Sequence, residues 1–208
     1  MKILIIVSNR FNGHEFWLTL KILKQSNIQS HVIAISPKIE DEVTGCAVNV
    51  HGILHDFDIE TLSEYAGIAV ISGNLRDTQV HWYDKVVHDI ILKAMELDIL
   101  IAAICCSVPS IRCAAKGKKV SFFPLNISKD LLREAGAVLT TLSEQVDGKL
   151  VTAETQMSTQ IWAENIVHVL NDTYVDPNLI DVGDITVPKK SNRKLDPEIE
   201  RLINSIKP

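Results

Sequence analysis

Residues 99–110, ILIAAICCSVPS, decide the fold of this chain. An uncharged and mostly apolar run, residues 99–104, leads into two adjacent cysteines, Cys105 and Cys106, and small or turn-compatible residues follow. Such a run, coming after a long helical pattern, predicts a strand buried in a parallel sheet. A cysteine at the abrupt end of a buried strand, just before a helix, has the geometry of a nucleophile elbow. We therefore expect the Cys105 thiol at the carboxyl edge of the sheet, where open α/β folds place their sites.

Strand and helix patterns alternate before this stretch. Apolar runs of strand length cover residues 2–7, 31–36 and 67–71, and apolar side chains at helical spacing cover residues 14–26 and 81–96. This alternation is typical of a doubly wound parallel sheet with right-handed crossovers. The sequence therefore predicts an α/β fold, a flavodoxin-like three-layer sandwich with a mostly parallel central sheet, helices on both faces and a nucleophile elbow.

The remaining patterns are shorter, and most of them follow the elbow. Pro124 stops one apolar run, and the dipeptide Asp147-Gly148 is a hairpin signal. In chain order these patterns predict a short strand over 46–51, a helical turn over 59–65, a strand over 118–123, a helix over 128–135 with Ser128 as its N-cap, hairpin strands over 139–142 and 149–153, and a helix over 155–170.

Composition limits the classes of function. The chain has 208 residues and a formal net charge of −5, so it lacks the basic footprint of a nucleic-acid-binding protein. No apolar run approaches the roughly 18 residues of a membrane helix. The apolar run near Met1 is too short for a signal peptide and no small-residue cleavage site follows it, so we expect a cytoplasmic protein. The four cysteines lack zinc spacing, so we expect free thiols, no metal and no cofactor.

The character of the sequence changes after about residue 170. Residues 171–195 contain prolines that interrupt regular structure and a basic polar run, and this composition indicates a linker. Residues 196–207 begin with Asp196-Pro197, a strong helix start, and continue with an apolar stripe. We expect this short amphipathic helix to dock on its own domain or on a second subunit, because a helix of this length is marginal alone.

Several motifs resemble one known family. Residues 101–105, IAAIC, are similar almost letter for letter to the elbow of the ThiJ/PfpI family, within the class I glutamine amidotransferase-like superfamily. The resemblance covers residues 1–170, and its weaker parts are residues 2–7, Glu15, residues 71–75, residues 116–120 and residues 146–152. It implies a relative of intracellular proteases, deglycases and stress-response chaperones that acts on a small-molecule substrate as a homodimer.

The resemblance also implies roles for residues near the elbow. Cys105 is the expected nucleophile, and Glu15 stands where the family keeps a carboxylate that tunes the thiol. Cys106 occupies the place where hydrolytic relatives carry a histidine, and Phe123 occupies a second such place. His14 is the one histidine that the sequence places near the pocket, so it is the candidate general base.

The residues themselves add two expectations about the site. The amides of Gly73 and Cys106 are the candidate oxyanion hole. A thiol at a helix N-terminus has a pKa below its usual value of about 8.5, so we expect a reactive Cys105. A disulfide between Cys105 and Cys106 is not expected, because adjacent Cα atoms lie closer than disulfide geometry favours.

Three functions remain open. The first is a cysteine-dependent hydrolase, amidase, glyoxalase or deglycase that acts on small carbonyl or amide compounds. The second is a non-enzymatic redox-sensing or chaperone-like stress protein that uses the same thiol. The third is a binding module whose pocket holds a ligand without chemistry.

Overall fold

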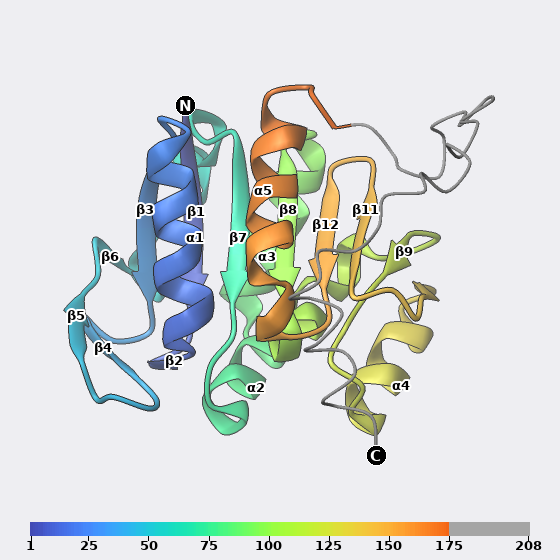
Figure 1. The fold of residues 1–208 in the computed structure, drawn as a ribbon, viewed down its shortest axis with the longest axis horizontal. Helices are drawn as coiled ribbons and strands as arrows, with labels where there is room; N and C mark the ends of the chain where they lie inside the picture. The colour runs from blue at the N-terminus through green and yellow to red at the C-terminus, as the bar shows by residue number, and fades with distance from the viewer. Residues whose placement is uncertain (175–208) are drawn as a thin grey trace, which may run out of the picture. The chain divides into compact units, whose positions relative to one another are not determined.

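A seven-stranded sheet forms the centre of residues 1–174, the part of the chain that the computed structural model describes (Figure 1). Every neighbouring pair of strands in it is parallel except the pair at one edge, β11 and β12. In spatial order the strands are β11 (Glu144–Asp147), β12 (Leu150–Ala153), β8 (Leu100–Ile104), β7 (Gly67–Ile71), β1 (Lys2–Val7), β3 (Gln29–Ala34) and β6 (Gly52–Ile53). The predicted flavodoxin-like α/β fold is confirmed.

Helices cover both faces of this sheet. The helices α1 (Gly13–Gln25) and α5 (Thr159–Leu170) lie side by side on one face, and α3 (Lys85–Glu96) lies on the other (Figure 1). Alternate side chains of a strand point to opposite faces. Ile3 and Ile5 of β1 therefore belong to the core under α1 and α5, and Leu4 belongs to the core under α3.

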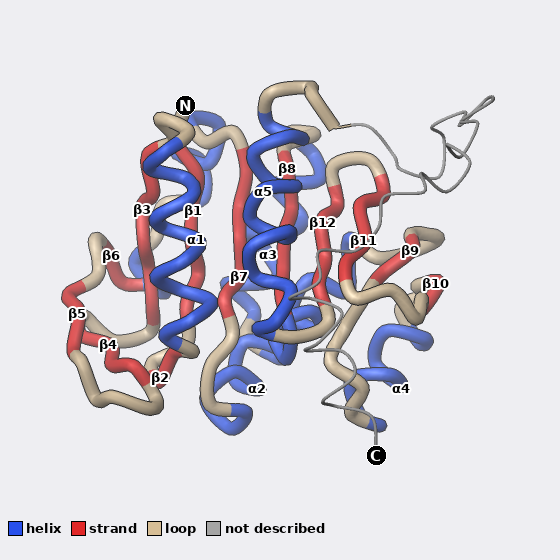
Figure 2. The backbone as a smooth tube through the Cα atoms, viewed as in Figure 1, coloured by secondary structure: helices blue, strands red, loops and turns tan. Residues whose placement is uncertain are grey.

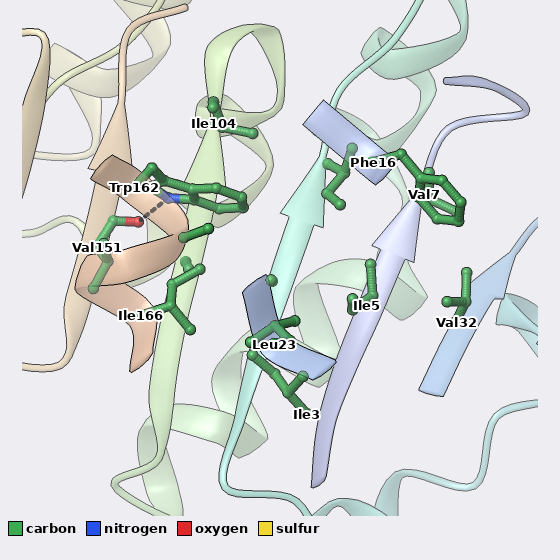
Figure 3. Packing of buried hydrophobic residues seen from close by; sticks show 14 of the residues in the cluster. Ile3, Ile5, Val7, Phe16, Leu23, Val32, Ile104, Val151, Trp162 and Ile166 are labelled. Atoms are coloured by element: carbon green, nitrogen blue, oxygen red, sulfur yellow. Dashed lines mark hydrogen bonds between the residues drawn. The ribbon is translucent and has the colours of Figure 1, made fainter. Parts of the chain in front are cut away.

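The core under α1 and α5 is anchored by a tryptophan. Trp162 of α5 is fully buried, and its indole N–H donates to the backbone oxygen of Val151 in β12 at 3.1 Å (Figure 3). Phe16 and Leu23 of α1 fill the same layer. Full burial of one such apolar side chain contributes about 1.5–3 kcal/mol, so this layer fixes α1 and α5 against the sheet.

The helix predicted over 81–96 is wrong in its first part. The structure has two helices, α2 (Leu75–Tyr83) and α3, separated at Asp84. The Asp84 carboxylate accepts hydrogen bonds from the amides of Val86 and Val87 and so starts a new helix there. The segment after the elbow is also different from a regular α-helix. Residues Cys105–Ala114 form a 3₁₀ segment, η3, that contains Pro109.

Three elements after the elbow differ from the prediction. The strand over 118–123 shrinks to β9 (Lys119–Val120), which pairs with β10 (Val138–Leu139) in a separate sheet, because the Ser121 amide donates to a side chain, Thr152 Oγ1. The hairpin pairs β12 with residues 144–147 instead of 139–142. The helix α4 (Asn126–Glu134) begins after Leu125, so Ser128 lies inside it instead of capping it.

The remaining secondary structure of residues 1–174 consists of short strands and 3₁₀ helices. A three-stranded sheet lies beside β3 and contains the short strand expected near residues 46–51 (Figure 2). The strands of this small sheet are β2 (Arg10–Phe11), β4 (Lys38–Asp41) and β5 (Ala47–Asn49). The remaining short elements are the 3₁₀ helices η1 (Leu54–Asp56), η2 (Ile59–Glu64) and η4 (Gln156–Ser158). Within residues 1–174 no helix has the length and apolarity needed to cross a membrane. Most of the predicted linker and the whole helix over 196–207 lie outside the described residues.

Candidate functional site

The candidate site begins at the sharp turn after β8. Cys105 has a φ of 58°, the left-handed conformation that costs a non-glycine residue on the order of 1–3 kcal/mol. Ser107 holds this turn, because its hydroxyl accepts from the Ile104 amide at 3.1 Å and donates to the backbone oxygen of Val70 in β7 or of Ile104. The turn therefore presents the Cys105 side chain at the carboxyl edge of the sheet.

Hydrogen bonds join the helix α2 to the segment that follows the turn. The indole N–H of Trp82, a fully buried residue of α2, donates to the backbone oxygen of Cys106 at 2.7 Å. The Arg112 guanidinium donates to the backbone oxygens of Trp82 and of Pro109. These bonds tie η3 to α2, so the position of the two cysteines is fixed from both sides.

A buried carboxyl interacts electrostatically with the Cys105 thiol. Glu15 is in the first turn of α1, where the Asn12 side chain caps the helix by accepting from the Glu15 amide at 3.1 Å. Glu15 is fully buried, and its Oε2 accepts from the amide of Ser72 at 3.0 Å and from the Ser72 hydroxyl at 2.7 Å. Its Oε1 has no hydrogen-bond partner in the described residues.

Burial determines the ionisation of Glu15. Loss of solvation raises the pKa of this carboxyl well above its usual range, and the negative charge of a Cys105 thiolate raises it further, while the bonds from Ser72 act in the opposite direction. The carboxyl therefore favours its neutral form. Since Oε2 already accepts two hydrogen bonds, we place the proton of the neutral form on Oε1.

The two thiols are in contact. Their sulfur atoms are 3.8 Å apart, and the Cys105 thiol is oriented to donate to the Cys106 sulfur. Cys105 is half-buried, whereas Cys106 is only 8% exposed. All four cysteines of the chain are free, as expected.

The predicted lowering of the Cys105 pKa is wrong. The hydrogen bond to Cys106 and then burial raise the pKa of the Cys105 thiol, and they outweigh the Ser72 hydroxyl and the Cys106 amide, which both lower it. The same hydrogen bond lowers the pKa of the Cys106 thiol. The helix N-terminus therefore contributes only one amide near the sulfur, and the neighbouring thiol has the larger effect.

Gly73, a predicted member of the oxyanion hole, has a different role in the structure. Its amide donates to the Thr78 hydroxyl at 3.0 Å, so this donor is already engaged. A Cβ atom at this position would lie 1.9 Å from the backbone oxygen of Arg10, which explains why a glycine is needed here. The Cys106 amide lowers the pKa of the Cys105 thiol, and its place in an oxyanion hole stays a prediction.

The structure places His14 on the surface. It is an exposed residue in the first turn of α1, and no hydrogen bond or ion pair joins it to Glu15, to either thiol or to any other side chain in residues 1–174. Within the same residues no group of three or more His, Cys, Asp and Glu side chains could hold a metal ion.

Sequence reasoning missed two residues of the site. Ser72 links Glu15 to the Cys105 region, and Trp82 fixes the backbone of Cys106. Ser72 follows directly after the buried strand at residues 67–71, a position that could have marked it as a site residue. Trp82 has no such signal, because its partner depends on the packing of α2.

Comparisons with known proteins agree with this architecture. The sequence profile of the DJ-1/PfpI family matches residues 1–169. A ThiJ/PfpI domain protein from Brachyspira murdochii has a TM-score of 0.74 and 18% identity, with 82% of this chain and 96% of that chain covered. DJ-1beta from Drosophila melanogaster has a TM-score of 0.66 and 18% identity, with 81% of this chain and 89% of that chain covered.

A longer protein shares the same fold in one of its parts. A two-domain protein from Anabaena variabilis, with DJ-1/ThiJ/PfpI-like and ferritin-like domains, has a TM-score of 0.73 and 21% identity. The match covers 88% of this chain but only 52% of that chain. No curated protein matches this sequence significantly. From the profile match over residues 1–169, the chain belongs to the DJ-1/PfpI family.

Proposed function

We propose that this chain is a cysteine-dependent enzyme that acts on small carbonyl compounds, with glyoxalase-type or deglycase-type chemistry at Cys105. One observation carries the proposal: a buried carboxyl with a raised pKa, Glu15, interacts electrostatically with the half-buried thiol at the end of β8. The Ser72 hydroxyl bonds to Glu15 and also acts on the Cys105 sulfur, so it connects the two groups.

Addition of a thiol to a carbonyl group needs two proton transfers. The carbon–sulfur bond forms as the C=O π bond breaks, the thiol proton leaves, and the carbonyl oxygen gains a proton. The Cys106 sulfur accepts the hydrogen bond of the Cys105 thiol, and this bond lowers the pKa of the Cys106 thiol and so favours its thiolate form. The Cys106 sulfur therefore suits the role of proton acceptor. Glu15 supplies the other proton from Oε1, and the product is a hemithioacetal on Cys105.

The same geometry disfavours amide hydrolysis. Expulsion of an amine needs a group that protonates it and then activates a water molecule, and enzymes most often use histidine for this work. Cys106 and Phe123 occupy the two positions where the resemblance leads us to expect histidine, and His14 is exposed without a bond to either thiol. We therefore favour aldehydes and other small carbonyl compounds over amides as substrates.

Turnover of a small α-oxoaldehyde such as methylglyoxal tests this proposal. Cys105→Ser should abolish turnover, and Glu15→Gln should lower kcat by about 10²–10⁴-fold, the usual contribution of general acid–base catalysis. Cys113→Ser is the matched control, because Cys113 lies in the same segment η3 but outside the site. Full activity of the Cys105→Ser variant would exclude Cys105 as the nucleophile.

A redox-sensing or chaperone-like stress protein is the second candidate. It is supported by the lack of any imidazole bonded to the two thiols in residues 1–174. A cysteine thiolate reacts with peroxide to give sulfenic and then sulfinic acid. Intact mass after mild peroxide treatment distinguishes the candidates: oxygen added at Cys105, together with no turnover of α-oxoaldehydes, favours the sensor.

A further inference from the structure

Two thiols in one place offer a chemistry that a single thiol lacks. The Cys105 and Cys106 sulfurs are 3.8 Å apart and both belong to the carboxyl-edge site. We infer that these residues act as a vicinal dithiol that captures trivalent arsenic compounds, namely arsenite and aryl arsine oxides. This binding function goes beyond the carbonyl chemistry proposed above, because it uses both sulfurs as ligands of one atom and needs no contribution from Glu15.

The sulfur separation fits a bridging atom better than a direct bond. A disulfide needs sulfurs about 2.05 Å apart and Cα atoms at least about 4.4 Å apart, whereas Cα atoms of adjacent residues are separated by about 3.8 Å. The three bonds of trivalent arsenic are pyramidal and meet close to a right angle, so two sulfurs that each lie about 2.3 Å from it, the length of a zinc–thiolate bond, are about 3.3 Å apart. The observed separation of 3.8 Å is slightly longer, and rotation of the two side chains can shorten it with little movement of the backbone.

The number of available ligands selects arsenic over zinc. A structural zinc ion is held by four protein ligands, and the described residues offer no group of even three candidate ligands. Trivalent arsenic bound to an aryl or hydroxyl group needs only two sulfurs to complete its three bonds. The pair Cys105 and Cys106 supplies that number.

The charge balance also fits the site. An aryl arsine oxide and two thiols give an aryl dithioarsinite and one water molecule, in which the oxide oxygen leaves with both thiol protons. Arsenic stays trivalent throughout, so no oxidant or reductant is required. The product is neutral, so it places no charge beside the buried Glu15 carboxyl. Uncharged thiols react in this way, so the raised pKa of Cys105 is no obstacle. Where Cys106 is a thiolate, the proton that it lacks comes from water.

Phenylarsine oxide, added in equal amount to the reduced full-length chain, tests the inference by intact mass. We expect one phenylarsenic group per chain with the loss of two thiol hydrogens. A chelate on two thiols should resist excess 2-mercaptoethanol and should be removed by 2,3-dimercaptopropanol, because only a dithiol competes with a ring. Absence of any monothiol-resistant adduct on the wild-type chain would overturn the inference.

Single cysteine variants identify the two sulfurs that bind the arsenic atom. Cys105→Ser and Cys106→Ser should each lose the resistant adduct, while Cys46→Ser and Cys113→Ser should keep it, since no hydrogen bond in residues 1–174 joins those thiols to another sulfur. A resistant adduct that survives in Cys106→Ser would refute the dithiol. Far-UV circular dichroism confirms that each variant is folded. Glu15→Gln should keep arsenical capture while losing α-oxoaldehyde turnover, so the two proposals can fail independently.

Discussion

His81 should make the stability of this protein depend on pH between neutral and mildly acidic conditions. It lies in α2, is fully buried, and neither of its ring nitrogens has a hydrogen-bond partner in the described residues. Burial lowers its pKa from 6.5 to about 4, against the raising effect of the Asp84 and Asp77 carboxylates and together with a lowering effect of His55.

The sign and size of the effect follow from proton linkage. The folded state holds His81 neutral, so its contribution to stability is fully present above the unfolded pKa of 6.5 and is lost as the pH falls towards 4. A pKa difference of roughly 2.5 units corresponds to about 3 kcal/mol in total, of which about 2 kcal/mol is lost by pH 5. This loss is a large fraction of the roughly 5–15 kcal/mol that stabilises a typical domain.

Urea unfolding of the wild type and of His81→Met at pH 7.5 and at pH 5 measures this effect. At pH 7.5 the two proteins should have similar free energies of unfolding, because replacing an unpaired buried polar group by an apolar one of similar size is close to neutral. Between the two pH values the wild type should lose about 2 kcal/mol more than the variant. Carboxylates with lowered pKa, such as Asp84 and Asp147, are present in both proteins and largely cancel. An equal loss in both proteins would refute the reasoning.

Other perturbations test other parts of the structure. The raised pKa of Glu15 means that its contribution to the free energy of unfolding is lost as the pH rises above 4.5. Glu15→Gln should remove this loss, measured by urea unfolding at several pH values. The same pH dependence in variant and wild type would mean that this carboxyl is solvated. Gly73→Ala should lower stability by at least about 1–3 kcal/mol, read as a lower thermal midpoint, because its Cβ would clash with the Arg10 backbone oxygen. Trp82→Phe should cost about 1–3 kcal/mol in urea unfolding by leaving the Cys106 oxygen unpaired, and a loss near zero would show that this bond does not hold the elbow. If the helix predicted over 196–207 joins two subunits, deletion of residues 188–208 should convert a homodimer into monomers, measured as the mass of the assembly in solution divided by the mass of the shortened chain. An unchanged number of subunits would remove that helix from the interface.

The sequence by itself determined the elements that depend on local pattern. The apolar run over 99–104 and the cysteine at its end are enough to predict β8 and the turn at Cys105, because a buried parallel strand needs a continuous apolar segment. The alternation of strand and helix patterns likewise predicted the parallel sheet, and the elbow motif pointed to the family. Glu15 could be singled out only through the resemblance, since a carboxylate near a helix start is common on protein surfaces.

Only the tertiary structure decided the chemistry of the site, because its contacts join residues that are far apart in the chain. Ser72 bonds to Glu15 across 57 positions, and Trp82 bonds to Cys106 across 24. Thr78 engages the Gly73 amide that was expected to be free. The raised pKa of Cys105 depends on burial and on where the neighbouring sulfur lies after folding. Local pattern places a cysteine at a turn, but solvation and long-range hydrogen bonds determine whether it carries a charge.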